Sequence, residues 1–451
     1  MARARRGRST AKIDPESDAD ESECELGRVV DTPEYAEWAD GMADRACSHE
    51  RDPRSVCHHC FQDAGLRRYV RHAANARVCD FCGRRFRKDR AAPLETVARF
   101  VEGCLRRNYD HPENVLFYDR ESESGWAGNV WSNSELIEET VAADWPVMEA
   151  IIACFNPDFE WCEADPALFM PEEHLRVSWE IFCDYVKHRS RFMFLRPDES
   201  GRRFSDEQDD TLVRSTEMLD LFGEAIEACN LIHTLGARTR LYRVRSVSDS
   251  GWFTTPEDLG PPPSSPTGPP ASRMSPAGIP LLYVALDEKT ALEETMSGSG
   301  RASMAAFSPM RALRLLDLRG DRPVPYRSIF EKASSVERGM PQFVRAFRNE
   351  IARPVARDGR EHIEYVPSQI VTEFIRRVYR TSAGERLDGV LYPSTKNPEG
   401  VCAALFVTAG EIKDSGARYG REPLLRFRPR SVRRLQVRFR SGRVSRWSVA
   451  S

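Results

Sequence analysis

The residues between Arg273 and Glu294 include three side chains that could act on one ligand. Arg273 precedes a Pro/Gly turn, Tyr283 lies in a β-like run, and Glu294 follows in a predicted helix. An arginine binds a pyrophosphate through two parallel hydrogen bonds. An aromatic ring can stack on a base, and a carboxylate stabilises a sugar that becomes cationic. Together these groups suit a nicotinamide dinucleotide whose glycosidic bond is broken.

Four motifs in order between about Thr239 and Val407 resemble the RES domain. They are Leu241-Tyr242-Arg243, Arg273-Met274-Ser275-Pro276-Ala277-Gly278, Tyr283 to Glu294, and Asp388 to Ser394. The RES family is named for an arginine, a glutamate and a serine, and its studied members are NAD-consuming toxins with an ADP-ribosyltransferase-like fold. The resemblance implies a toxin or stress effector that cleaves NAD and is restrained by a protein antitoxin or inhibitor. No Gly-x-Gly-x-x-Gly follows a predicted strand, so NAD is expected to be a consumed substrate.

Two arginines are candidates for binding the NAD pyrophosphate. Arg243 is near the end of the first β-like run, and Arg273 is on the loop before the second. Either could instead form a surface salt bridge, and strand alternation leaves this open for Arg243 because Arg245 would point the same way. The resemblance favours Arg243 and Arg273. It also favours Tyr283 for stacking on the nicotinamide or adenine ring, although an aromatic residue in a strand often belongs to the core.

Glu294 is the predicted catalytic carboxylate. Breaking the nicotinamide–ribose bond creates an oxocarbenium-like cation, which a carboxylate can stabilise while it holds the 2′-hydroxyl. Glu294 lies four residues after Thr290 in a Thr-Ala-Leu-x-Glu pattern. Its neighbour Glu293 takes this role if the register differs by one. Alternatively, both glutamates only complement the helix N-terminus.

The resemblance also implies a serine, for which Ser394 is favoured. Its hydroxyl would contact the nicotinamide amide or a ribose oxygen. Ser368 is the rival, but it suits the N-cap of a helix through Phe374, with Pro367 just before it. A long insertion separates Glu294 from Ser394.

Two Cys-x-x-Cys motifs, Cys57–Cys60 and Cys79–Cys82, are eighteen residues apart. This spacing is typical of a structural zinc site with four cysteine ligands, and Gly83 provides turn freedom behind the second motif. A dithiol redox pair and free buried cysteines explain the paired spacing less well. Other residues that could replace one ligand are His58, His59, Cys47 and His49.

The predicted fold class is α+β, with an N-terminal zinc ribbon and helical bundle before an ADP-ribosyltransferase-like mixed α/β RES domain. The expected divisions are a disordered segment 1–46, a zinc-ribbon-like segment 47–93, a helical HEPN-like domain 94–236, a RES domain 237–420 and a basic C-terminal strand or tail 421–451. Helices are predicted over 94–105, 287–296 and 367–379, and from Ser132, Pro171 and Ser205 onward. Strands are predicted at 240–244, 280–286, 313–318, 389–392, 403–407 and 435–439.

The helical middle resembles, in arrangement and patterning, the HEPN-type domain found ahead of RES domains. HEPN ribonucleases carry an arginine followed after a few residues by a histidine, and Arg106 or Arg107 with His111 could be fitted to this pattern. Because His111-Pro112 lies past a predicted helix end, core packing and partner binding explain the segment better than a ribonuclease site.

Composition leaves a nucleic-acid-binding module as the alternative function. The formal net charge of −3 favours no partner class. Basic residues nevertheless gather beside the second cysteine motif, at 84–88, and in the tail from Arg426 to Arg446. That tail could equally be an edge strand with a solvated face. The chain has neither a long apolar run nor a signal-peptide pattern, so a cytoplasmic location is expected.

Overall fold

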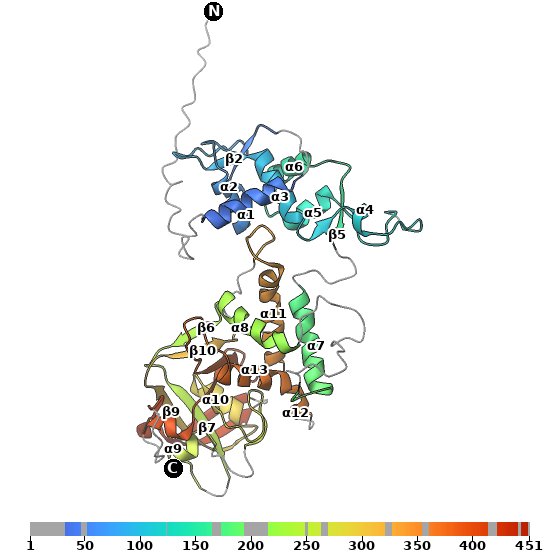
Figure 1. The fold of residues 1–451 in the computed structure, drawn as a ribbon. Coiled ribbons are helices and arrows are strands. Elements are labelled where there is room, and N and C mark those ends of the chain that lie inside the picture. Colours follow the sequence, from blue (N-terminus) through green and yellow to red (C-terminus); the bar gives the residue numbers. More distant parts are fainter. Residues whose placement is uncertain are drawn as a thin grey trace, which may run out of the picture. The chain divides into compact units, whose positions relative to one another are not determined.

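The computed structural model describes the chain as two compact units (Figure 1). Unit 1 comprises Met1–Glu172 and Tyr326–Arg338, and unit 2 comprises Glu173–Pro325 and Gly339–Ser451. The described residues are 32–46, 52–122, 124–164, 173–193, 215–248, 251–262, 269–320, 327–353, 360–413, 422–440 and 443–449. Among them, no helix is both long and apolar enough to cross a membrane.

Unit 1 is mainly helical, with two small antiparallel sheets, β1-β2 and β3-β5-β4. Its elements are α1 (Pro33–Asp44), β1 (Ser55–Cys57), η3 (His58–Cys60), α2 (Ala64–His72), β2 (Ala91–Pro93), α3 (Leu94–Leu105), β3 (Tyr109–Asp110), α4 (Pro112–Val115), β4 (Trp131–Ser132), α5 (Asn133–Thr140), α6 (Trp145–Cys154) and β5 (Glu160–Glu163). Helix α3 has the predicted bounds and is buried along most of its length. The predicted capping box of Ser132 and Glu135 begins α5.

Helix α1 lies within the segment that we expected to be disordered, so that expectation is wrong for Pro33–Asp44. The helix packs closely on α3: a Cβ atom at Gly103 would be 1.8 Å from the carbonyl oxygen of Met42. Tyr35 and Ala39 are buried on the same helix. The helix is amphipathic enough to join the core despite its charged flanks. Residues 1–31 are outside the described residues.

A returning segment, residues 327–338, completes the core of unit 1. Phe330 is fully buried among the side chains of the N-terminal helices. The guanidinium group of Arg107 donates to the carbonyl oxygens of Ile329 at 2.7 Å and Glu331 at 3.0 Å, and also to that of Ala333. Unit 1 is therefore assembled from two stretches of chain that are separated by about 150 residues in sequence.

Unit 2 is built around one large sheet. Its helices are α7 (His174–His188), α8 (Ser215–Ala228), α9 (Pro256–Leu259), α10 (Glu288–Thr295), α11 (Ser335–Ala352, which begins in unit 1), α12 (Glu361–Glu364), α13 (Val366–Arg377), and the short η4 (Ala409–Glu411) and η5 (Pro429–Ser431). Its strands are β6 (Ile232–Leu235), β7 (Leu241–Val247), β8 (Leu282–Ala285), β9 (Gly300–Pro309), β10 (Leu313–Asp317), β11 (Gly389–Pro393), β12 (Val401–Leu405), β13 (Ile412–Lys413), β14 (Leu425–Phe427), β15 (Arg433–Arg440) and β16 (Arg443–Val449).

The strands follow the order β13-β14-β9-β7-β8-β12-β11-β10-β6, and β15 pairs with both β9 and β16. Side chains alternate between two apolar layers. Leu241 belongs to one layer together with Phe307. Val244 belongs to the other, where it packs with Leu292 of α10. The site residues are thus distributed between two faces according to the parity of their position in a strand.

The observed divisions differ from the expected ones at both ends of the sheet unit. Helices α7 and α8 belong to unit 2 and not to a separate helical domain, because Trp179 packs on Phe343 and Phe347 of α11. Beyond residue 420, β14 and β15 pair with β9, so the basic tail is part of the sheet. The expected helix start at Ser205 is outside the described residues.

Candidate functional site

The predicted glutamate and serine meet in the structure. Glu294 lies in the last turn of α10, and Ser394 follows β11. The Ser394 hydroxyl donates to Oε1 of Glu294, and the backbone N–H of Thr395 donates to the same oxygen at 3.1 Å. Ser394 is buried and Glu294 half-buried. Among the described residues Oε2 of Glu294 has no partner, so one oxygen is held while the other is available to a ligand.

A compact turn holds Ser394 in place. The Ser394 oxygen accepts hydrogen bonds from the backbone N–H groups of Lys396 at 3.2 Å and Asn397 at 3.0 Å. The Asn397 amide donates to Thr290 Oγ1 at 2.7 Å, which ties the turn to α10. A Cβ atom at Gly400 would be 2.2 Å from Thr290 Oγ1, so this approach requires glycine. We did not identify Thr290 and Asn397 as site residues from the sequence, although the Ser-x-x-Asn spacing could have suggested such a turn.

Arg243 lies where two central strands separate. Strands β7 and β8 share one registered pair, Tyr242 with Ala285. Beyond it, Nη1 of Arg243 donates to the Tyr283 carbonyl oxygen at 2.6 Å. Nη2 has no partner among the described residues. Burial lowers the pKa of Arg243 to about 10, so the guanidinium group remains charged at neutral pH.

Arg273 lies on a loop that contacts Tyr283 and α13. The Tyr283 hydroxyl hydrogen-bonds to the hydroxyls of Ser272 and, at 3.1 Å, Ser275. The Ser368 hydroxyl donates to the Arg273 carbonyl oxygen at 2.5 Å. The guanidinium group itself donates to the Ile351 carbonyl oxygen at the end of α11. One corner of the guanidinium is therefore fixed, and its other donors remain for a ligand.

Ser368 is not the N-cap that we expected. The cap of α13 is Tyr365, and Ser368 lies within the first turn. The Ser368 hydroxyl donates to the Tyr365 carbonyl oxygen at 3.0 Å as well as to Arg273. Pro367 occupies the first turn, where its missing N–H costs no helical hydrogen bond. Ser368 thus supports the Arg273 loop and is not part of the Glu294–Ser394 pair.

Tyr392 is a site residue that we missed. It lies two residues before Ser394 on β11, and its side chain packs in the same apolar layer as Cys402. Burial raises the pKa of Tyr392 well above its usual value. The nearby Tyr283 and Glu294 raise the pKa of Tyr392 further, whereas Arg273 lowers it. These three residues therefore lie near the phenol of Tyr392, which is neutral. Strand parity links Tyr392 with Ser394 and could have identified it.

Glu293 and Glu294 have different environments. Glu293 is 3 % exposed, and its Oε1 has no partner among the described residues. Both residues are in the second half of α10, so neither complements the helix N-terminus; the acidic residue of the first turn is Glu288. Only Glu294 contacts the serine turn. The contacts therefore favour Glu294 for the chemical role.

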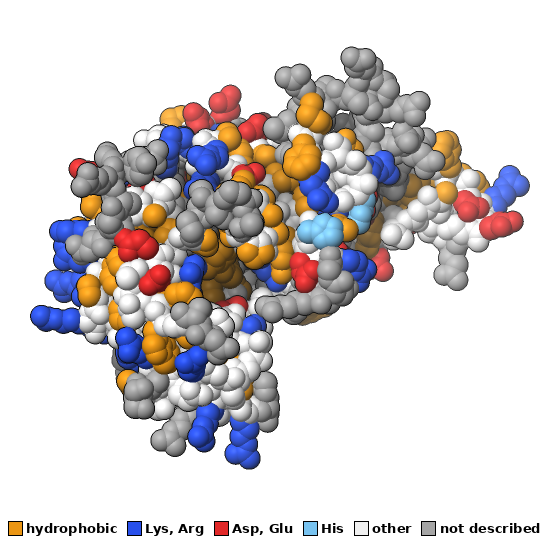
Figure 2. Space-filling view, turned by 90° about the horizontal axis from the view of Figure 1, so that it is seen from below, with side chains coloured by type: hydrophobic (Ala, Val, Ile, Leu, Met, Phe, Trp, Pro, Cys, Tyr) orange, Lys and Arg blue, Asp and Glu red, His pale blue; other side chains and the backbone are white. Residues whose placement is uncertain are grey.

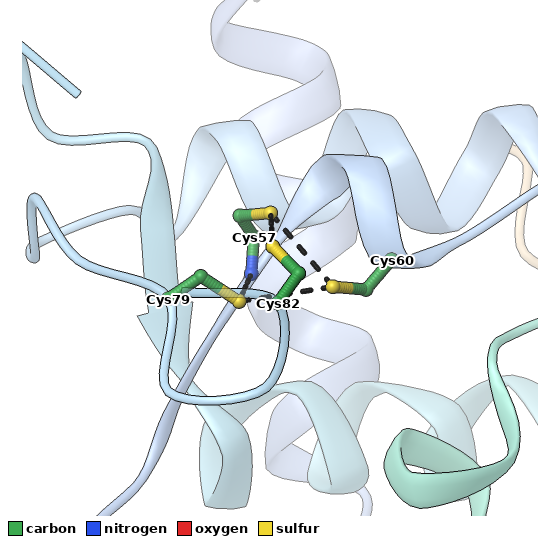
Figure 3. A group of neighbouring side chains, drawn as sticks. All are labelled: Cys57, Cys60, Cys79 and Cys82. Carbon is green, nitrogen blue, oxygen red and sulfur yellow. Dashed lines mark hydrogen bonds between the residues drawn. The ribbon is translucent and has the colours of Figure 1, made fainter. Parts of the chain in front are cut away.

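Four cysteines of unit 1 converge in one cluster (Figure 3). The sulfur–sulfur distances are 3.8 Å for Cys57–Cys60, 3.6 Å for Cys57–Cys82 and 3.7 Å for Cys60–Cys79. Four sulfurs at about 2.3 Å from a tetrahedral zinc ion are about 3.8 Å apart. The cluster can therefore hold zinc. Gly83 behind it has the predicted left-handed conformation, with φ of 72°.

The histidines near this cluster are not among its ligand atoms. Within the described residues the group that could hold a metal consists of the four cysteines. His58 and His59 pack against each other, with ring centroids 4.1 Å apart, and His59 stacks on Phe86. Cys47 and His49 are outside the described residues.

The arginine–histidine pattern of the helical middle has structural roles. Arg106 donates to Glu102 at 2.9 Å and its guanidinium carbon is 5.0 Å from the Phe159 ring centroid. Arg107 binds the carbonyl groups of the returning segment. His111 begins α4 by accepting from the Glu113 N–H at 3.3 Å. These contacts explain the three residues without a ribonuclease site.

Fold and site define an α+β protein with a helical N-terminal region and a C-terminal sheet unit. Comparison with known families is more specific: residues 240–424 match the RES domain, and residues 72–200 match HEPN/RES N-terminal domain 1. The chain therefore carries a RES domain preceded by a HEPN/RES N-terminal domain. Comparison with curated proteins and with solved structures found no match.

Proposed function

We propose that unit 2 cleaves NAD at the nicotinamide–ribose bond. A RES domain is consistent with NAD-related activity in general. The observation that supports this reaction best is the pairing of Glu294 with Ser394 and Thr395, which come from segments about a hundred residues apart. Two donors on Oε1 orient the carboxylate, and they leave Oε2 for the substrate.

In the proposed reaction the C–N bond breaks and its electron pair leaves with nicotinamide, which becomes neutral. The ribose carbon gains positive charge, and the carboxylate of Glu294 stabilises it while accepting a hydrogen bond from the 2′-hydroxyl. The acceptor is water, phosphate or a protein side chain, which forms the new bond and releases a proton. Ser394 acts through Glu294, because its hydroxyl donates to that carboxylate and its oxygen already accepts from two backbone N–H groups.

The two arginines would bind the pyrophosphate. Each has one guanidinium donor on a backbone carbonyl oxygen, which restricts its orientation, and other donors free for phosphate oxygens. Tyr283 is proposed to contact a nicotinamide or adenine ring while its hydroxyl steadies the Arg273 loop. The proposal also includes an ADP-ribosyltransferase-like fold for unit 2. The protein would act as a toxin or stress effector that a protein antitoxin restrains.

Zinc is the proposed ligand of the cysteine cluster, held by Cys57, Cys60, Cys79 and Cys82. Helix α2, between the two motifs, is anchored in the core by Leu66, Tyr69 and Val70, whereas residues 80–85 around the second motif are largely exposed. Metal binding would therefore contribute mainly to the local folding free energy of the second motif. The proposed role is structural, because all four sulfurs would be ligands and no position would remain for a substrate.

The reaction is tested by incubating the full-length protein with NAD, with and without phosphate, and identifying the products by mass spectrometry. Free nicotinamide together with ADP-ribose, its 1″-phosphate or ADP-ribosylated protein is expected, and the second product identifies the acceptor. Intact NAD after prolonged incubation with protein at high concentration would contradict the proposal.

A further inference from the structure

The outer strands of the sheet carry arginines on one face. In β15, Leu435 and Val437 are buried, while the alternating residues Arg434, Arg438 and Arg440 are exposed. Cross-strand register extends the same face to neighbouring strands. We define the arginine face as Arg245, Arg301, Arg434, Arg438, Arg440 and Arg443.

Two aromatic side chains lie among these arginines. The backbone N–H of Phe253 donates to the Ser303 hydroxyl at 3.0 Å, which lays the segment after β7 over this face. The guanidinium carbons of Arg301 and Arg434 are 5.6 Å and 5.8 Å from the Trp252 ring centroid. That of Arg245 is 5.4 Å from the Phe253 ring. Both rings are half-buried, so part of each is accessible.

Four arginines of this face carry a charge that no described carboxylate neutralises. Among the described residues, Arg434, Arg438, Arg440 and Arg443 have no carboxylate partner. Arg433, whose side chain points to the other face of the sheet, pairs with Glu288. Arg440 is directly opposite Arg443 across the β15–β16 pair, and like charges in such positions destabilise a sheet. Folding gains little from this arrangement, whereas a polyanion would relieve its repulsion.

The positive charge of the arginine face is local and does not follow from the net charge of the protein. Over the side of the molecule drawn in Figure 2, acidic side chains lie among the basic ones, in keeping with the formal net charge of −3. Diffuse attraction of any polyanion to the whole surface is therefore weak. Specific placement on the arginine face requires a partner that combines regularly spaced negative charge with planar rings.

We propose that the arginine face binds single-stranded nucleic acid. Alternate residues of β15 are about 7 Å apart, which is about the rise of two stacked nucleotides. Trp252 and Phe253 offer surfaces on which bases stack, and arginines bind the phosphates. An acidic protein segment would use the charges but not the rings.

This surface is separate from the Glu294–Ser394 site. Glu294 is on α10, whose Leu292 packs in the same layer as Leu435 and Val437. Arg434, Arg438 and Arg440 are on the opposite side of these strands, so their occupation leaves Glu294 and Ser394 open. Arg245 has the same strand parity as Arg243, and the variants below leave both unchanged. The proposal is thus independent of the reaction proposed for NAD.

The test is fluorescence anisotropy of the full-length protein with a labelled oligouridine of about 20 nucleotides, longer than the ~4–16 nucleotides that one binding groove covers. Titrations between about 50 and 200 mM salt give the salt dependence of the affinity. The triple variant Arg434→Ser/Arg438→Ser/Arg440→Ser should lower the slope of log K against log salt by about 2, at about 0.7 per phosphate contact. Trp252→Ala should weaken binding by about five- to a hundredfold.

The matched control is Arg84→Ser/Arg85→Ser/Lys88→Ser, which removes the same charge from exposed positions in unit 1. It should bind like the wild type, and thermal melting should show that all three variants are folded. The proposal is wrong if the wild-type protein does not bind, if either sheet variant keeps wild-type affinity, or if the control loses as much. Equally tight binding of polyglutamate would also overturn it and indicate an acidic protein partner.

Discussion

Replacing Glu294 by glutamine is the most direct test of the proposed reaction. Glutamine keeps a carbonyl oxygen at the Oε1 position, so the hydrogen bonds from Ser394 and Thr395 can remain. The change removes the negative charge and little else. Thermal stability should barely change, because Glu294 is half-buried and forms no ion pair among the described residues.

The expected loss follows from the electrostatics of the half-buried carboxylate. A charge at about 4 Å from the developing cation contributes about 4 kcal/mol at an effective dielectric constant of ~20. The transition state loses most of this stabilisation, whereas bound NAD, with its pyrophosphate on the arginines, loses little. We therefore expect kcat to fall by about two to four orders of magnitude and KM to change by less than about tenfold.

Glu293→Gln is the matched control, because it makes the same chemical change one residue away. Glu293 is buried and does not contact the serine turn, so its replacement should leave kcat near the wild-type value. The assay is steady-state release of nicotinamide by the wild type and both variants, with melting curves for each. If the two variants exchange behaviour, Glu293 is the catalytic residue. If both retain wild-type kcat while the wild type consumes NAD, the proposed mechanism is refuted.

Three further predictions concern the arginines, the metal and the helical unit. Arg243→Ala and Arg273→Ala should each raise KM for NAD more than they lower kcat, because phosphate contacts stabilise ground and transition states alike; unchanged KM in both variants would contradict the pyrophosphate assignment. Elemental analysis of protein purified without chelator should find one zinc per chain. Chelation should make unit 1 more sensitive to proteolysis while NAD cleavage persists. Absence of zinc would contradict the assignment of Cys57, Cys60, Cys79 and Cys82 as its ligands. Arg107→Ala should destabilise unit 1 by about 3 kcal/mol in denaturant unfolding, because buried carbonyl groups lose their donor; unchanged stability would show that the returning segment is held by apolar packing alone.

The parts of the structure that depend on neighbouring residues could be predicted from the sequence. The apolar spacing of α3 and the capping box of α5 act within a few residues, and both elements have the predicted bounds or start. The cysteine cluster could also be predicted from residue spacing, because each Cys-x-x-Cys motif places two sulfurs on one side of a turn. Motif order predicted Glu294 and Ser394 individually as site residues.

Tertiary structure alone decided which groups meet. Three contacts join segments about a hundred residues or more apart. Ser394 holds Glu294, Ser368 supports Arg273, and Phe330 completes the core of unit 1. Strand β9 escaped prediction because its alanines and serines have little intrinsic β-propensity, and it is a strand because β7 and β15 pair with it on either side. Local pattern sets the conformation of a segment, whereas the choice of its partners depends on burial and hydrogen bonding that arise only when distant segments come together.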